Sequence, residues 1–258
     1  MIFKIFRSTN IGLWAVILLF FGTIPFSSFA QNQPLLRIST ENNANHVQTK
    51  VVQMFVDRLN EKLKDSLQVD FHHSAQLFRD SNVVKALADG KVEMAVLGTW
   101  QLDRFEANVG IFLLPMFYGR DAKINYELRD GQFGEAINNN INDSLGVKVL
   151  GRWIDLGYAH LYSTKHKIKN HQDLNGMKIR TPGGDANSLR LQLLGAAPTI
   201  IPWPDLPQAL DYGKIDAVLT TNATIVSAKL WEHGIRYVFE DRQYFPQYVP
   251  IISQRFWK

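Results

Sequence analysis

Cysteine is absent from this sequence of 258 residues. Without a thiol there is no disulfide framework, no thiolate metal site, no cysteine nucleophile and no cysteine for lipid attachment. A chain of this size can bury a sizeable core without cross-links. We therefore expect a fold that is stabilised by apolar packing and hydrogen bonds alone.

The sequence motifs of common enzymes are also missing. There is no GxSxG nucleophile elbow, no HExxH zinc motif, no GxGxxG dinucleotide loop and no GxxxxGK phosphate loop. Adjacent histidines on a predicted strand, such as His72 and His73, face opposite sides, and His166 and His171 lie in a polar loop. We expect solvated histidines, and neither an enzyme, nor a cofactor, nor a metal centre.

Long apolar runs are limited to one segment near the N-terminus. Lys4 and Arg7 precede the uncharged stretch 11–24, and small residues ending in Ala30 follow it. The stretch is shorter than the roughly 18 residues expected of a membrane helix, and its flanks are typical of a secretory signal. Residues 1–30 are therefore predicted to be a cleavable signal peptide, with a membrane anchor as the alternative.

Charge of one sign is not in large excess. The formal net charge is +4, and cleavage after Ala30 lowers it to +2, because the removed segment holds Lys4 and Arg7 and no acid. No tract rich in lysine and arginine is interleaved with aromatic residues, so we expect no nucleic-acid partner. The mature chain is expected in the periplasm of a Gram-negative cell and not itself membrane-spanning; secretion outside the cell is the competing destination.

Strand and helix patterns alternate along the first part of the mature chain. Apolar residues recur at intervals of three and four through 46–63, which predicts an amphipathic helix. Short β-rich runs bounded by polar turns predict strands. The resulting βαβαβ order is typical of an open, mostly parallel sheet covered by helices. The predicted elements are strands at 35–40, 67–72 and 92–97 and helices at 46–63 and about 82–88.

The same order returns in the second half of the chain. The pattern A-L-x-x-G-K occurs at 86–91 and again at 209–214, each time where a helix gives way to a strand. We infer two similar α/β lobes, 31–150 and 151–258, with a ligand cleft between them; chance similarity of two helix ends is the alternative. The predicted elements here are strands at 177–181, 199–203 and 214–220 and helices at 186–194 and 206–212.

Loops at the carboxyl ends of these strands are the candidate binding elements. Ligands of open α/β sheets bind where such loops lead into helices. In the first lobe, the loops ENNAN and GTWQ supply the candidates Asn42 and Trp100. In the second lobe the corresponding loops are TPGGDAN, PWPD and TTNAT.

Arg180 ends the predicted strand 177–181, just before a Gly-Gly loop and a helix that begins near Asp185. At the end of a strand, its side chain can point into the cleft, beside the positive end of that helix. A guanidinium grips a carboxylate with two parallel hydrogen bonds. Arg180 is thus the candidate receptor for a ligand carboxylate; the alternative is an internal pair with Asp185 or Asp205.

Three stretches of the sequence carry a resemblance to a known family. DLNGMKIRTPGG, LGAAPTIIPWPDLPQAL and GKIDAVLTT resemble the central signature of the solute-binding subunits of TRAP transporters, the DctP-like family. This resemblance implies a two-lobed periplasmic solute-binding fold, type II-like. It implies a receptor that captures an organic acid, such as a C4-dicarboxylate, and delivers it to membrane permease subunits driven by an ion gradient. A ligand-sensing module that acts through a separate membrane partner is the alternative.

The resemblance also assigns site residues. It gives Arg180 the ion pair with the ligand carboxylate, and it places His160 where several members have a second arginine. Thr220 stands where the family has an asparagine. Trp203 falls where an aromatic residue often faces the ligand, although a core role is equally open.

The C-terminus departs from the family pattern. Members usually continue for several helices beyond the segment that corresponds to YVPIISQRFW, whereas this sequence stops at Lys258. We therefore expect shortened C-terminal helices and a second lobe that is incompletely covered, either in a fragment or in a compact variant.

Overall fold

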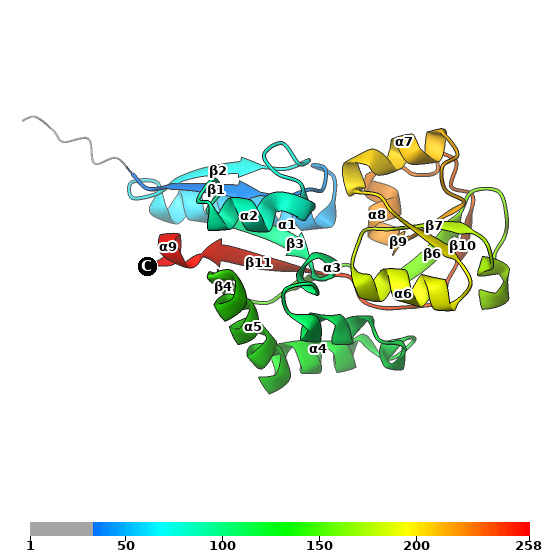
Figure 1. The fold of residues 1–258 in the computed structure, drawn as a ribbon. Helices are drawn as coiled ribbons and strands as arrows, with labels where there is room; N and C mark the ends of the chain where they lie inside the picture. Colours follow the sequence, from blue (N-terminus) through cyan, green and yellow to red (C-terminus); the bar gives the residue numbers. More distant parts are fainter. Residues whose placement is uncertain (1–32) are drawn as a thin grey trace, which may run out of the picture. The chain divides into compact units, whose positions relative to one another are not determined.

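The computed structural model describes residues 33–258, and the predicted signal peptide lies outside this range. These residues form two β-sheets flanked by helices (Figure 1). The first sheet contains β1 (Leu35–Ser39), β2 (Gln68–His72), β3 (Met94–Gly98), β4 (Val147–Val149), β5 (Ile154–Asp155) and β11 (Gln247–Ser253). The second contains β6 (Ala159–Ser163), β7 (Lys178–Thr181), β8 (Ala197–Ile200), β9 (Ala217–Thr221) and β10 (Tyr237–Phe239).

Helices connect most of these strands. None of the helices between residues 33 and 258 combines the length and the apolar composition that crossing a bilayer requires. The α-helices are α1 (Val47–Leu63), α2 (Asp80–Ala88), α3 (Thr99–Leu102), α4 (Ala122–Asp130), α5 (Gln132–Leu145), α6 (Asp185–Leu193), α7 (Leu206–Asp211), α8 (Asn222–Ser227) and α9 (Gln254–Trp257). Short 3-10 helices are η1 (Ala107–Leu113), η2 (Pro115–Phe117), η3 (His171–Leu174) and η4 (Trp203–Asp205).

Both sheets are mixed, so the expectation of mostly parallel sheets is wrong. The first sheet has the order β2-β1-β3-β11-β4, in which β1 is parallel to its neighbours and β11 is antiparallel to β3 and β4. The second has the order β10-β6-β9-β7-β8, with β6 antiparallel to β9 and β10. Each sheet is mixed because the strand that follows a crossing, β6 in the second sheet and β11 in the first, runs antiparallel to its neighbours.

The C-terminal strand β11 belongs to the first sheet. It lies between β3 and β4 and is drawn in red among the strands of that sheet in Figure 1. The sequence analysis assigned residues 151–258 to the second lobe, whereas β11 pairs with strands of the first sheet. The chain passes from the first sheet to the second at 156–158 and returns at 240–246, and both crossings run beside the cleft. β11 is buried along its whole length, whereas Trp257 beyond it is 56% exposed.

Two apolar layers cover the two faces of the first sheet. Strand side chains alternate between faces, so Ala95 and Leu97 of β3 pack with α2 and α5 on one face, together with Val249 and Ile251 of β11. The intervening residues of the same strands pack against α1 on the other face. Every apolar side chain of β3 is thus buried, which explains why its sequence, MAVLG, shows no alternation of polar residues.

The second sheet is arranged in the same way. Ile179 of β7 and Leu219 of β9 pack on one face with Leu191 of α6. Val218 of β9 lies on the other face with Leu206 of α7. Arg180 is paired with Val218 across the ladder and therefore lies on the α7 face of the sheet. This register turns the guanidinium away from the α6 core.

Candidate ligand-binding site

One cavity is lined by residues from both sheets and from both chain crossings. Its floor includes Leu156 from the first crossing and Tyr244 and Pro246 from the second. Five of the six residues predicted from the sequence line this cavity, and His160 does not. The five are Asn42, Trp100, Arg180, Trp203 and Thr220.

Arg180 is buried, at 3% exposure, and holds only one hydrogen bond to the described part of the protein. Its Nε donates to the carbonyl oxygen of Ile201 at 2.9 Å, which fixes the plane of the guanidinium. The two terminal nitrogens have no acceptor among residues 33–258. Burial lowers the pKa of Arg180 to about 10, and the charge of Glu41 opposes this shift, so Arg180 remains cationic at neutral pH. The cavity therefore contains a fixed cation with unused donors.

The internal ion pairs considered for Arg180 are not formed. Asp205 is held by Arg79, whose two terminal nitrogens lie 2.5 and 3.0 Å from its carboxylate oxygens. The backbone N–H of Asp185 donates a hydrogen bond to the carboxylate of Asp103 at 3.1 Å. Both contacts join an element beside the first sheet to one beside the second, and together they bridge the edge of the cleft.

Glu41 is a cavity residue that the sequence analysis missed. It lies in the predicted ENNAN loop, next to Asn42, and is 8% exposed. Burial raises the pKa of Glu41, and the charge of Arg180 opposes that rise. Behind it, the fully buried carboxyl of Asp80 has its pKa raised by burial and by Glu41. The sequence did contain an indication of this, because Glu41 is an acid in the ENNAN loop, which had already been assigned to the cleft.

Asn42 positions an aromatic hydroxyl within the cavity. Its Nδ2 donates to Oε1 of Gln48 at 2.9 Å and to the hydroxyl oxygen of Tyr248 at 2.8 Å. Because both protons of this amide are used, Asn42 can offer a ligand only its Oδ1 acceptor. The hydroxyl proton of Tyr248 remains available to a ligand, and burial raises the pKa of that hydroxyl.

Two tryptophans form aromatic walls. Trp100 meets Tyr248 edge to face with ring centroids 5.2 Å apart. Trp203 lines the cavity and also packs into the α7 core with Leu206. Thr220, at the end of β9, is 7% exposed and presents its hydroxyl at the same wall.

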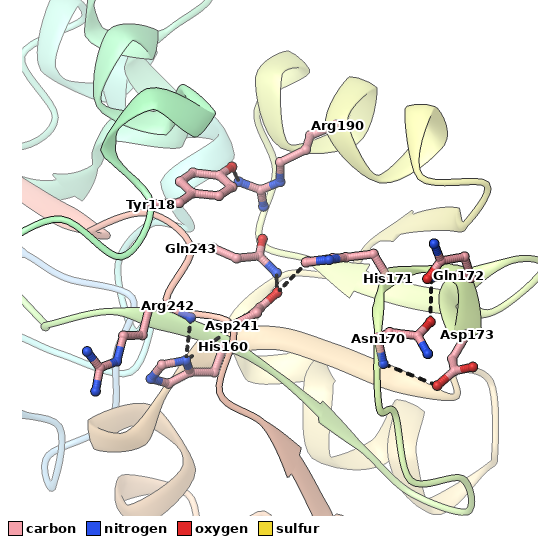
Figure 2. Close-up of polar contacts among 10 residues, drawn as sticks. All are labelled: Tyr118, His160, Asn170, His171, Gln172, Asp173, Arg190, Asp241, Arg242 and Gln243. Carbon is pink, nitrogen blue, oxygen red and sulfur yellow. Dashed lines mark hydrogen bonds and ion pairs between the residues drawn. The ribbon is translucent and has the colours of Figure 1, made fainter.

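His160 occupies a polar cluster outside the cavity lining (Figure 2). Its Nδ1 accepts the backbone N–H of Arg242 at 3.2 Å and lies 4.0 Å from Asp241. The same Asp241 carboxylate lies 3.5 Å from His171 and accepts from Gln243. Burial lowers the pKa of His160, against the opposing charge of Asp241. His160 thus contacts the chain crossing 240–246 and does not line the cavity.

The described residues contain no group of three or more histidine, aspartate or glutamate side chains arranged to hold a metal ion. The polar groups of the cavity instead suit an organic anion. Arg180 supplies the charge, Tyr248 and Thr220 supply neutral hydrogen-bond donors, and the tryptophans exclude water from the ion pair.

His46 is a buried histidine at the cleft. It caps α1, with Nδ1 accepting the Gln48 N–H at 3.2 Å, and its Nε2 lies 3.4 Å from the hydroxyl of Thr224. Its ring also stands edge to face with Trp203 and Tyr248. Burial lowers the pKa of His46 to about 4.

We expect His46 to stay neutral in the folded protein down to about pH 4. The unfolded chain takes up this proton near the ordinary pKa of 6.5, so the stability linked to His46 is complete above 6.5 and is lost as the pH falls toward 4. Histidine NMR titration measures the pKa directly, and the His46→Gln variant should lose this part of the pH dependence. A ring that titrates near 6.5 in the folded state would contradict the prediction.

Comparison with known proteins identifies the family. The family model described as bacterial extracellular solute-binding protein, family 7, or DctP, matches residues 38–258. The chain belongs to this family, which confirms the resemblance drawn from its sequence motifs. The family is named for solute binding and not for catalysis, in agreement with the expectation of a binding protein rather than an enzyme.

Curated relatives are distant but extensive. The chain is 24% identical over 211 residues to the 2,3-diketo-L-gulonate-binding periplasmic protein YiaO of Escherichia coli, covering 82% of this chain and 63% of the relative. It is 25% identical over 209 residues to the C4-dicarboxylate-binding periplasmic protein DctP of Shewanella loihica, covering 79% of this chain and 59% of the relative. The chain thus spans about six tenths of the length of these relatives.

Solved structures show the same fold. A TRAP periplasmic solute-binding protein from Sulfurospirillum deleyianum with bound succinate superposes with a TM-score of 0.82 at 23% identity, covering 87% of this chain and 71% of that chain. One from Polaromonas with bound D-erythronate gives a TM-score of 0.80 at 20% identity, covering 87% and 73%. These matches confirm the expected two-lobed α/β solute-binding fold.

Proposed function

We propose that this protein is the periplasmic receptor of a TRAP transporter, which binds a small organic acid through Arg180 and delivers it to membrane permease subunits. The observation that carries the proposal is the buried guanidinium of Arg180, which lines the cavity with two terminal nitrogens that have no acceptor within residues 33–258. A buried cation without a partner is costly, and a carboxylate that accepts both hydrogen bonds removes this cost.

The comparisons support the proposal at the level of ligand chemistry. Succinate and D-erythronate, which are bound in two structural neighbours, both carry a carboxylate. The named relatives are periplasmic binding proteins, which supports export through the segment 1–30 and a location in the periplasm. The permease is proposed as the partner because the neighbours are named as TRAP proteins.

Ligand capture is proposed to close the two lobes around the cavity. The two chain crossings, 156–158 and 240–246, lie at its floor and would serve as the hinge, since hinges are short segments that join two rigid bodies. The opposite edge is bridged by the ion pair between Arg79 and Asp205. The closed form is thus stabilised by a contact that does not touch the ligand.

Breaking this edge contact should weaken binding modestly. The side chains of Arg79 and Asp205 are 43% and 45% exposed, so their pair contributes about 0.2–1 kcal/mol. Arg79→Ala is therefore expected to raise the Kd up to about fivefold, mainly through faster ligand release. Stopped-flow and equilibrium titrations measure both quantities. Lys85→Ala, in the helix α2 that follows Arg79, is the matched control and should change neither, since the Lys85 side chain is 79% exposed. An unchanged release rate in Arg79→Ala would contradict the role of this pair in closure.

The proposed function is tested by identifying what the purified protein carries. Native mass spectrometry should detect a small acid bound with a stoichiometry of about one, and denaturation should release the same acid unchanged. Chemical conversion of the acid by the protein would contradict a pure receptor. Failure of every carboxylate to bind in calorimetric titrations would overturn the proposal itself.

A further inference from the structure

The charges that line the cavity are few. Among the described residues that line it, Arg180 is the one cation and Glu41 is the one acid. The remaining lining residues are neutral, namely asparagine, threonines, tyrosines, tryptophans, prolines and leucines. The cavity therefore brings one positive and one negative side chain to the same ligand.

Among residues 33–258, the basic side chains near the cavity other than Arg180 are not free to hold a second ligand carboxylate. Arg79 contributes charge near Glu41 but is bound by both carboxylate oxygens of Asp205. His46 does not line the cavity and is uncharged at neutral pH, because burial lowers its pKa to about 4. His160 is directed to the crossing 240–246. A second carboxylate on the ligand would therefore be buried without a counterion.

Glu41 would also repel such a second carboxylate. Its own side chain is buried beside the carboxyl of Asp80, and burial together with Glu41 raises the pKa of that second acid, so Glu41 is the acid that faces the cavity. Burying a further like charge there is unfavourable, because like charges in a site of low dielectric disfavour each other's ionised form. A dicarboxylate pairs well with Arg180 at one end and poorly at the other.

A hydrogen-bond donor suits the same position. The carboxylate of Glu41 accepts a hydrogen bond from the backbone of Asp80 but from no side chain within residues 33–258, and the Oδ1 of neighbouring Asn42 has no donor there. A ligand hydroxyl or ammonium group could donate to the acceptor positions that remain. The cavity thus offers a cation for one carboxylate and acceptors for one donor group.

We infer that the ligand is a monocarboxylate that carries a hydroxyl or ammonium donor, and that Glu41 selects it against dicarboxylates. This inference rests on the proposed function, since it assumes that Arg180 holds the ligand carboxylate. It narrows the organic acids expected from the sequence, which included C4-dicarboxylates.

The test uses four-carbon ligands that share one carboxylate and differ in the polar group carried elsewhere on the chain. Titration calorimetry on the full chain compares butanoate, 4-hydroxybutanoate, 4-aminobutanoate and succinate, together with 2-hydroxybutanoate and 2-aminobutanoate. A second pair, galactonate and galactarate, makes the same comparison on a six-carbon chain. A donor-bearing monocarboxylate is expected to bind at least about tenfold more tightly than the dicarboxylate of the same chain length and than butanoate.

The variant Glu41→Gln removes the negative charge and keeps the shape. It should shift the preference toward the dicarboxylate by at least about tenfold, because the repulsion is gone. Glu61→Gln, on the exposed side of α1, is the control for net charge and should leave the preference unchanged. Hydroxyl and ammonium ligands are told apart in the same variant, since the ammonium ligand should lose more affinity than the hydroxyl ligand.

The outcomes separate the inference from the proposed function. If the dicarboxylate of either series binds most tightly to the parent protein, the inference is overturned while the receptor function stands. An unchanged preference in a folded Glu41→Gln variant removes Glu41 as the selecting residue. If the variant does not fold, the ranking in the parent protein decides alone. If no carboxylate of either series binds, the proposed function fails together with the inference.

Discussion

Arg180→Ala is expected to lower the affinity for a carboxylate ligand by about 100-fold or more. The variant removes two charge-assisted hydrogen bonds, each of which contributes roughly 1.5–3 kcal/mol, and leaves the ligand carboxylate unpaired in a closed cavity. Titration calorimetry against the ligand identified by native mass spectrometry gives the change directly. Arg180→Lys keeps the charge but not the planar pair of donors, and it should fall between the parent and Arg180→Ala.

The same variant should not lose its fold. Arg180 is 3% exposed, and its one hydrogen bond to the described part of the chain runs from Nε to Ile201. Removing a buried charge without a counterion offsets the loss of that one bond. We expect the denaturation midpoint of ligand-free Arg180→Ala to lie close to that of the parent. A variant that binds the ligand as tightly as the parent would contradict the assignment of Arg180 as the carboxylate receptor. The denaturation midpoint also shows whether a loss of binding is caused by unfolding of the variant.

Ile251→Ala is expected to reduce the free energy of unfolding by about 2–5 kcal/mol, the usual cost of truncating a fully buried isoleucine. Ile251 is 0% exposed and sits in β11, opposite Ala95 of β3 on one side and Val149 of β4 on the other. The cavity left by the substitution would therefore lie in the middle of the first sheet. Denaturant unfolding monitored by circular dichroism measures the change.

The matched control for this variant is Ile200→Ala. Ile200 is 61% exposed at the end of β8, so its truncation should change stability by less than about 0.5 kcal/mol. Equal effects of the two substitutions would show that β11 does not contribute to the core of the first sheet as described.

Local elements could be predicted from the sequence because their signals are local. The predicted helix 46–63 and the observed α1 differ by one residue, because the spacing of apolar residues is helical. The buried face is a different one, however: Val51, Met54 and Phe55 are exposed, and the buried residues are Gln48, Thr49, Val52 and Val56. The repeated A-L-x-x-G-K pattern marks real helix ends in both lobes. Gly90 and Gly213 have φ of 69° and 61°, the left-handed conformation that glycine adopts without strain.

The place of β11 could not be predicted in this way. Its sequence is that of a buried strand, but nothing local says that it pairs with β3 and β4, which are remote in the chain. Dividing the chain at one boundary assumes that each lobe is continuous. Here the first sheet is completed by the last strand, so contacts of high sequence separation decide the lobe to which residues 247–253 belong.

Only part of the candidate site could be predicted from the sequence, because the contacts between its residues also depend on segments that are remote in the chain. Strand ends are recognisable in the sequence, and Arg180 and Thr220, at the ends of β7 and β9, line the cavity together with Trp203 of η4. His160 was placed there by correspondence with a family arginine, whereas its ring is held by the backbone of Arg242. Glu41 was missed because an acid is not expected to contact a carboxylate ligand. Its place in the cavity lining becomes visible only in the folded structure.

The most direct test of the central claim is a crystal structure of the protein with its ligand. The account predicts that one ligand carboxylate accepts hydrogen bonds from both terminal nitrogens of Arg180, with the Nε bond to Ile201 unchanged. A ligand whose carboxylate is bound elsewhere, with the terminal nitrogens of Arg180 paired to Glu41, would contradict it.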